Sequence, residues 1–377
     1  MPTTLPTTVR SYHLGAGDGI ERLSLRTRAP RRPGPGEVAV AVRAASLSYR
    51  ELLVLRRQYV LPVAPDVIPV SDGAGEVVAV GPDVHRVRPG DRVSAALFPQ
   101  WLDGPLEPAR LAQLGGSLDG MLTELAILPA DALVPVPEHL SYAEAATLPC
   151  AAVTAWNALT GDGRGVRPGQ TVLATGSGGV SLFAVQFAKL LGARVIATTG
   201  DRAKERRLRE AGADEVVDYR AVPDWHTAAR ELTGGLGVDR VVDTAGTLEQ
   251  SLRAVAVDGH VALVGSVSGD WAPVDPRLLF GAAATLRAVA VGSRAQFSAM
   301  NDVIATHRLR PVIDRVFPFE EAPAAYRYYE TARPFGKVVI EFPRAPLAAP
   351  AGDGQRFGRP GHSAQRRLRQ GSSYGAS

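Results

Sequence analysis

The stretch Thr175-Gly-Ser-Gly-Gly-Val-Ser181 decides the fold, because it joins a short apolar run, Thr171 to Thr175, to an apolar segment of helical character, Val180 to Leu191. Glycines at such a junction allow a tight turn, and backbone N–H groups can then approach a pyrophosphate at the positive end of the helix. Ser181 stands where a third glycine would let helix and strand pack closely. A purely structural glycine-rich turn is the competing interpretation. We expect a dinucleotide to be bound by Gly176, Ser177, Gly178, Gly179 and Val180.

The chain after this turn continues to alternate strand-like and helical segments as far as Gly265. Such alternation predicts βαβ units and an α/β fold with a doubly wound parallel sheet. Before about residue 135, short β-branched runs such as Glu37 to Arg43 are separated by Gly and Pro clusters, which predicts a β-rich region. The segments Val312 to Phe317 and Gly336 to Ile340 predict strands that return to this region.

The length of 377 residues favours two domains, since single cores stop growing at roughly 250 to 300 residues. We expect a β-rich catalytic domain in residues 1–135, an inserted nucleotide-binding domain in 136–295 and a return to the catalytic domain in 296–343. Residues 344–377 are rich in Gly, Pro, Ala, Ser and Gln and lack apolar periodicity. They predict a disordered basic tail.

The formal net charge of +4 at first favours an anionic partner such as nucleic acid. However, the last 34 residues contain six Arg and one Asp, which leaves the preceding 343 residues with a net charge of −1. The charge therefore does not indicate nucleic-acid binding. The single cysteine, Cys150, excludes an intramolecular disulfide and fits a reducing compartment. No secretory signal and no apolar run of the ~20 residues that span a membrane is present, so we expect a cytoplasmic protein without a membrane partner.

The choice of cofactor depends on the end of the second strand of the nucleotide domain. Sites for NAD usually place a carboxylate there, about 20 residues after the glycine-rich turn, to bind the ribose 2′-OH. This chain has Thr199 at that point, followed by Arg202 and Lys204, with Tyr219 as a further neighbour. Positive charge suits a 2′-phosphate, so NADP(H) is preferred. NAD(H) stays possible if Asp201 binds the 2′-OH instead.

Four strings resemble the medium-chain dehydrogenase/reductase superfamily, specifically its zinc-independent branch similar to quinone oxidoreductases and NAD(P)-dependent alcohol dehydrogenases. They are Ser46-Leu-Ser-Tyr-Arg-Glu-Leu-Leu53, Pro69-Val-Ser-Asp-Gly-Ala-Gly-Glu-Val77, Ala146-Thr-Leu-Pro-Cys-Ala-Ala-Val-Thr-Ala-Trp-Asn157 and Phe335-Gly-Lys-Val-Val339. The resemblance covers about residues 9–343 and implies a GroES-like β-rich catalytic domain with an inserted Rossmann domain. Relatives of this kind are commonly homodimers or homotetramers.

The resemblance also locates where zinc-dependent relatives hold their catalytic metal. Alignment of the motifs puts the three ligand positions at Ser48, Ser71 and Cys150, and a catalytic zinc needs three N, S or carboxylate ligands. Only Cys150 is such a ligand, so we expect no metal. Glu51 and Asp72 could be proposed as oxygen ligands, but the more economical interpretation is that they support the pocket by hydrogen bonding.

A site without zinc lacks a Lewis acid, which favours substrates that accept hydride with hydrogen-bond help alone, such as quinones and enones. The resemblance implies Tyr59 and Tyr49 as candidate donors, and Thr154 and Asn157 as residues beside the nicotinamide. It further implies cofactor contacts at Gly265, Ser293 and Lys337. A solvated strand charge is the alternative for Lys337, and Cys150 is interpreted as an unreactive thiol.

The resulting hypothesis is an NADP(H)-preferring oxidoreductase that reduces a small quinone, enone or related carbonyl compound. Interconversion of an alcohol with a ketone or aldehyde is the enzymatic alternative. A nucleotide-binding sensor or partner protein without turnover is the alternative from another class.

Overall fold

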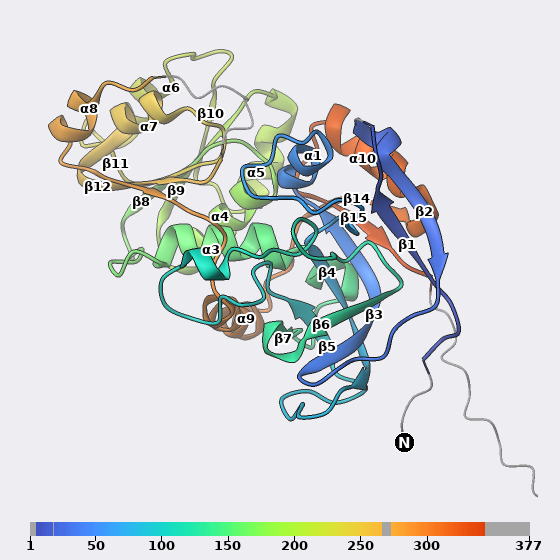
Figure 1. Cartoon of the computed structure of the whole chain (residues 1–377). Coiled ribbons are helices and arrows are strands. Elements are labelled where there is room, and N and C mark those ends of the chain that lie inside the picture. The colour runs from blue at the N-terminus through green and yellow to red at the C-terminus, as the bar shows by residue number, and fades with distance from the viewer. Residues whose placement is uncertain (1–4, 18, 266–272, 344–377) are drawn as a thin grey trace, which may run out of the picture. The chain divides into compact units, whose positions relative to one another are not determined.

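The computed structural model describes residues 5–17, 19–265 and 273–343. The predicted tail, residues 344–377, lies outside them. Within the described ranges the chain forms a seven-stranded sheet, a six-stranded sheet and a two-stranded ribbon of β1 (Val9–Leu14) and β2 (Leu23–Arg28) (Figure 1).

The seven-stranded sheet has the order β14-β15-β3-β4-β5-β7, and β6 pairs with β3. Its strands are β3 (Glu37–Leu47), β4 (Asp72–Val80), β5 (Arg92–Ala95), β6 (Leu125–Pro129), β7 (Leu133–Pro135), β14 (Ile313–Pro318) and β15 (Lys337–Glu341). Val38, Val40 and Val42 face one core while Ala39 faces another, as the two-residue period of a strand requires. β15 pairs antiparallel with β3, so the late strands lie in the first sheet as the sequence predicts. The domain limits themselves remain predictions.

The six-stranded sheet is parallel throughout and has the order β10-β9-β8-β11-β12-β13. Its strands are β8 (Thr171–Ala174), β9 (Arg194–Thr199), β10 (Glu215–Asp218), β11 (Val238–Asp243), β12 (Val255–Leu263) and β13 (Thr285–Ala288). Numbered along the chain, this is the 3-2-1-4-5-6 order of a Rossmann fold. The predicted fold class is therefore confirmed.

Helices cover both faces of the parallel sheet (Figure 1). Val172 of β8 packs into a core with Phe183 and Phe187 of α4, whereas Leu173 packs into a second core with Trp225 of α6. The α-helices are α1 (Tyr49–Leu55), α2 (Tyr142–Ala145), α3 (Val153–Thr160), α4 (Gly179–Leu190), α5 (Glu205–Glu210), α6 (Trp225–Glu231), α7 (Leu248–Ala254), α8 (Pro276–Gly281), α9 (Arg294–His307) and α10 (Ala322–Thr331). Single-turn 3₁₀ helices are η1 (Gly19–Arg22), η2 (Pro108–Arg110), η3 (Ala130–Ala132), η5 (Arg202–Lys204) and η6 (Phe319–Glu321).

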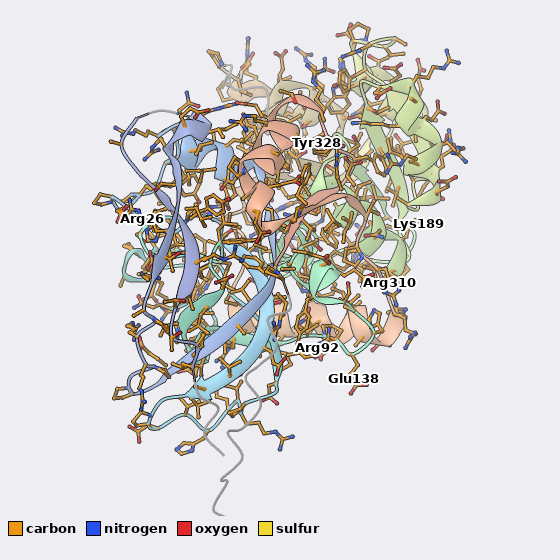
Figure 2. The ribbon with its side chains drawn as sticks, turned by 90° about the vertical axis from the view of Figure 1, so that its right-hand side faces the viewer. Arg26, Arg92, Glu138, Lys189, Arg310 and Tyr328 are labelled. Atoms are coloured by element: carbon orange, nitrogen blue, oxygen red, sulfur yellow. The ribbon has the colours of Figure 1, made fainter. Side chains whose placement is uncertain are left out.

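A helical segment leads from the β-rich sheet to the parallel sheet. The predicted capping box of Ser141 and Glu144 begins α2, and π-helical η4 (Leu148–Ala152) connects α2 to α3. Two arginines labelled in Figure 2 hold the start of α2: Arg92 stacks on the Tyr142 ring, and Arg310 forms an ion pair with Glu144 at 2.6 Å. Single π turns occur frequently at functional sites, which directs attention to η4.

In the part of the chain that the structure describes, no helix combines the length and apolar character that crossing a bilayer requires.

Candidate functional site

The glycine-rich turn connects β8 to α4, and no side chain caps the first turn of this helix. Gly176 has φ +79°, a conformation that favours glycine, and the N-cap residue Gly178 supplies no side chain to the helix N–H groups. A β-carbon on Gly178 would meet no atom of the described residues within 4 Å. These features fit a bound pyrophosphate.

Ser181, which departs from the expected fingerprint, holds the turn together. Its hydroxyl donates to the Thr175 carbonyl at 2.6 Å and lies 3.1 Å from the Thr244 hydroxyl oxygen. The Gly176 N–H also donates to the Thr198 hydroxyl at 3.2 Å. At Ser181, the third position of the fingerprint, these hydrogen bonds take the place of the close packing between helix and strand that a glycine would allow.

The turn is also bound to the β-rich sheet. The Gly336 N–H donates to the Ser177 carbonyl at 3.1 Å, and Gly336 has φ +99°. A β-carbon on Gly179 would lie 2.7 Å from Cδ of Lys337, so the lysine stem runs directly against the turn. The side chain of Lys337 is 2% exposed, and the alternative of a solvated strand charge is wrong.

The four residues predicted to select the cofactor lie at or just after the ends of β9 and β10, and the Tyr219 N–H donates to the Thr199 carbonyl at 2.9 Å. Thr199 is buried and accepts a hydrogen bond from the Asp201 N–H, while Asp201 caps the Ala203 N–H. Lys204 donates to the Arg333 carbonyl at 2.6 Å. Tyr219 leaves no room for a side chain at Gly200, since a β-carbon there would lie 2.3 Å from its ring carbon. Arg202 is exposed on the outside.

A buried network of charged and hydroxyl side chains fills the region where β3, β4 and β15 meet. Lys337 Nζ donates to Ser48 Oγ at 2.7 Å and to Asp72 Oδ2 at 3.3 Å. Ser48 Oγ in turn donates to Asp72 Oδ2 at 3.3 Å, and Ser71 Oγ donates to Asp72 Oδ1 at 2.9 Å. Lys337 and Asp72 are 2% and 0% exposed, so this ion pair is almost fully removed from water.

A second ion pair continues the network. Arg50 contacts Glu51 at 2.7 Å, and Glu51 Oε1 accepts from the Ser71 N–H at 3.3 Å and lies 3.1 Å from Ser71 Oγ. The Arg50 guanidinium also lies 4.8 Å from the centre of the Tyr59 ring. Glu51 and Asp72 thus support the site by hydrogen bonds, as the sequence predicts. Tyr59 contacts the Arg50 end of the network.

The network perturbs the groups beside it. Burial raises the pKa of Asp72, the Lys337 charge opposes this, and Glu51 adds to it. Burial and then the Asp72 carboxylate raise the pKa of the Cys150 thiol to about 12. A thiol with such a pKa is protonated at neutral pH, which agrees with the interpretation of Cys150 as unreactive.

The remaining predicted residues occupy different surroundings. Thr154 donates to the Cys150 carbonyl at 2.6 Å and so lies beside the π turn. Asn157 instead donates to the Val291 carbonyl at 2.6 Å and accepts from Arg287 and Gln296. Ser293 forms a capping box with Gln296 at the start of α9. Asn157 and Ser293 therefore use their side chains to hold the 289–296 segment, and a cofactor contact by either stays a prediction. Gly265 follows β12, and a β-carbon there would meet no atom within 4 Å among the residues that the structure describes.

Sequence reasoning missed Tyr329 of α10. Burial is the main cause that raises the pKa of Tyr329. Electrostatic interactions with Cys150, Glu51, Asp72 and Tyr49 raise it further. Tyr329 is only partly exposed. No local motif marks this residue, which packs against the core of the β-rich sheet.

A cavity of about 60 Å³ lies at the opposite, N-terminal ends of the parallel strands, where Arg164, Arg240, Asp258 and His260 line it. Its charges are compensated locally, since Arg164 pairs with Asp258 and Arg240 pairs with Asp162. The glycine-rich turn is the better candidate for binding a dinucleotide. It lies at the C-terminal end of β8, where ligands of such sheets bind, and it precedes the positive end of a helix.

Comparison with known proteins agrees with this geometry. Residues 34–138 match the family model described as the alcohol dehydrogenase GroES-like domain, and residues 179–306 match the model described as zinc-binding dehydrogenase. A zinc-type alcohol dehydrogenase-like protein of Schizosaccharomyces pombe is 40% identical over 320 residues, which cover 83% of this chain and 92% of that protein. The chain belongs to the medium-chain dehydrogenase/reductase superfamily. It is an NAD(P)-dependent oxidoreductase, as the sequence predicts.

Two further superfamily members are similar to this chain. A quinone oxidoreductase of Pseudomonas aeruginosa is 35% identical over 266 residues, covering 69% of this chain and 74% of that protein. A solved structure from Sinorhizobium meliloti 1021, named as an alcohol dehydrogenase, has a TM-score of 0.84 and 37% identity, and covers 90% of this chain and 100% of that one.

The zinc that the family description implies requires a test against the residues present. The three aligned positions offer two serine hydroxyls and one thiol whose pKa is raised to about 12, and the Lys337 ammonium lies 2.7 Å from the first of those hydroxyls. In the described ranges, no group of three or more His, Cys, Asp or Glu side chains is arranged to hold a metal. This donor set does not fit a catalytic zinc.

Proposed function

We propose that this superfamily member is a metal-free, NADP(H)-preferring reductase of quinones, enones or related conjugated carbonyl compounds. The observation that carries the proposal is the Lys337–Asp72 ion pair at the aligned zinc position, next to an intact dinucleotide turn. A conjugated acceptor needs no Lewis acid, because its developing oxygen charge can be stabilised by hydrogen-bond donors.

The preference for NADP(H) is supported by the end of β9. Thr199 replaces the carboxylate that would bind a ribose 2′-OH, and Asp201 already accepts from the Ala203 N–H. Lys204 follows β9 and Tyr219 follows β10, and their ammonium and phenol groups both suit a phosphate. The bound cofactor would supply the hydride, while the chain's residues bind and orient it.

The decisive experiment follows the reduced-nicotinamide absorbance with NADPH and with NADH, against a quinone, an enone and a simple ketone, with and without a chelator. We expect the conjugated acceptors with NADPH to be turned over fastest, and the chelator to have no effect. Inhibition by the chelator contradicts the metal-free proposal. Turnover of the simple ketone alone supports the alcohol dehydrogenase alternative, and tight NADPH binding without turnover supports the sensor.

We further propose that the protein is cytoplasmic and forms a homodimer or homotetramer. The outer strand of the parallel sheet, β13, pairs with β12, and its Thr285, Leu286 and Ala288 are exposed. An exposed edge strand is suited to pairing with a second copy. Sedimentation equilibrium measures the assembly, and a monomer at micromolar concentration contradicts it.

A further inference from the structure

Lys337 is an unusual residue in this chain. Of 42 basic residues, 39 are Arg and three are Lys, at positions 189, 204 and 337. An ammonium is a compact point charge, whereas a guanidinium is broad and planar and needs several aligned acceptors. The place beside Ser48 and Asp72 therefore accommodates a small cation.

The surroundings of Lys337 Nζ supply oxygen atoms and negative charge from separate elements. Ser48, immediately before α1, accepts at 2.7 Å, and Asp72, at the start of β4, accepts at 3.3 Å. A β-carbon on Gly179 would lie 2.7 Å from Cδ of Lys337 and 3.3 Å from Cβ of Ala151, so the lysine stem passes close to η4, which contains Cys150. The ammonium thus lies at the first aligned ligand position and beside a carboxylate, and its stem passes the helical segment that carries the third position.

Charge compensation in the network requires this cation. Arg50 compensates Glu51, so Lys337 is left as the partner of Asp72, which is 0% exposed. An unpaired buried carboxylate is strongly unfavourable, so the position demands a positive charge of some kind. A divalent metal would satisfy the same demand, but it would be repelled by an ammonium a few ångströms away.

We propose that the Lys337 ammonium is a built-in cation that takes the place of the catalytic metal of zinc-dependent relatives and excludes a metal from this site. Lys337 thereby acts as a positioning residue that orients Ser48 and Asp72. The inference rests on the proposed metal-free function, but metal binding measured without turnover tests it separately.

The test uses two variants that differ at Lys337. Ser48→Cys adds a second thiol, so that with Cys150 and Asp72 three zinc ligands are present at almost unchanged side-chain volume. The full-length Ser48→Cys protein and Ser48→Cys/Lys337→Met are compared by equilibrium dialysis with Zn²⁺ under a non-chelating reductant. We expect the second variant to bind one Zn²⁺ at least about 100-fold more tightly, because the repelling charge is gone.

A matched control is Ser48→Cys/Lys189→Met, since Lys189 is a half-exposed surface lysine paired with Asp214 (Figure 2). Its zinc affinity should equal that of Ser48→Cys. Circular dichroism and thermal melting establish that each variant is folded. If the variant with Lys337→Met does not fold, Lys337→Gln is used in its place. Equal zinc affinity with and without Lys337, or no zinc binding in either variant, overturns the inference. Failure of the NADPH assays with this zinc result intact would instead count against the proposed function.

Discussion

Nζ of Lys337 lies 2.7 Å from Oγ of Ser48, although 289 positions separate the two residues in the chain. The antiparallel register of β15 on β3, with Val338 opposite Leu47, brings them together. The same β3 strand pairs Ser46 with Asp72 of β4. One strand therefore aligns the lysine, the hydroxyl and the carboxylate at a single end of the sheet.

Replacement of Lys337 by Met should leave the buried Asp72 carboxylate without its cationic partner. We expect the free energy of unfolding to fall by about 3 to 5 kcal/mol at pH 8, the cost of breaking a buried ion pair from one side. Urea denaturation at several pH values measures it. The double variant Asp72→Asn/Lys337→Met is the control and should recover much of the loss, because position 72 then carries no charge that needs a partner.

The same variant should show a defined pH dependence. Burial raises the pKa of Asp72 in the folded protein, so the folded state binds the proton more tightly than the unfolded state. Ionised Asp72 then opposes folding as pH rises above the ordinary carboxyl range, and without Lys337 this effect grows. Lys337→Met should be closer to wild-type stability at pH 5 than at pH 8. A loss of equal size at both pH values contradicts this prediction.

Two adjacent glycines of the dinucleotide turn should differ in their tolerance of a methyl group. Gly179→Ala would place a β-carbon 2.7 Å from Cδ of Lys337 and 3.3 Å from Cβ of Ala151, whereas Gly178→Ala meets no atom within 4 Å. We expect Gly179→Ala to lower stability by about 1 to 3 kcal/mol through overpacking, and Gly178→Ala to leave it unchanged. If the pyrophosphate binds over this turn, Gly178→Ala still raises the Kd for NADPH in a fluorescence titration.

Lys204 should distinguish the two cofactors. Lys204→Met removes a cation at the end of β9, so we expect the Kd for NADPH to rise about tenfold while the Kd for NADH changes little. Arg202→Ala, at an exposed neighbouring position, is the matched comparison and should have the smaller effect. If the Kd values for NADPH and NADH rise by the same factor, Lys204 acts through its hydrogen bond to the Arg333 carbonyl and not through a phosphate.

The single thiol provides a direct measurement. Because the pKa of Cys150 is raised from 9.0 to about 12, its thiolate fraction at pH 8 is about 1,000-fold below that of an unperturbed thiol. Alkylation by iodoacetamide, followed by mass spectrometry, should be slow in the folded protein and normal in urea. Fast alkylation with a midpoint below pH 9 would show that the thiol is activated.

The dinucleotide turn, the capping box at Ser141 and the alternating segments of the parallel sheet were predictable from the sequence, because each depends on residues within one or two turns of chain. The Gly-rich stretch needs a strand before it and a helix after it, and both are adjacent in sequence. Apolar periodicity then specifies which side chains of each element face a core.

The composition of the site required the tertiary structure. Nothing local in Phe335-Gly-Lys-Val-Val339 shows whether its lysine meets solvent, a cofactor or a buried carboxylate, and Tyr329 of α10 belongs to no motif. Strand register decides the surroundings of Lys337, since a shift of one residue would turn every side chain of β15 to the other face. Local sequence therefore determined the dinucleotide-binding fold, and long-range strand pairing decided that an ammonium occupies the aligned metal position.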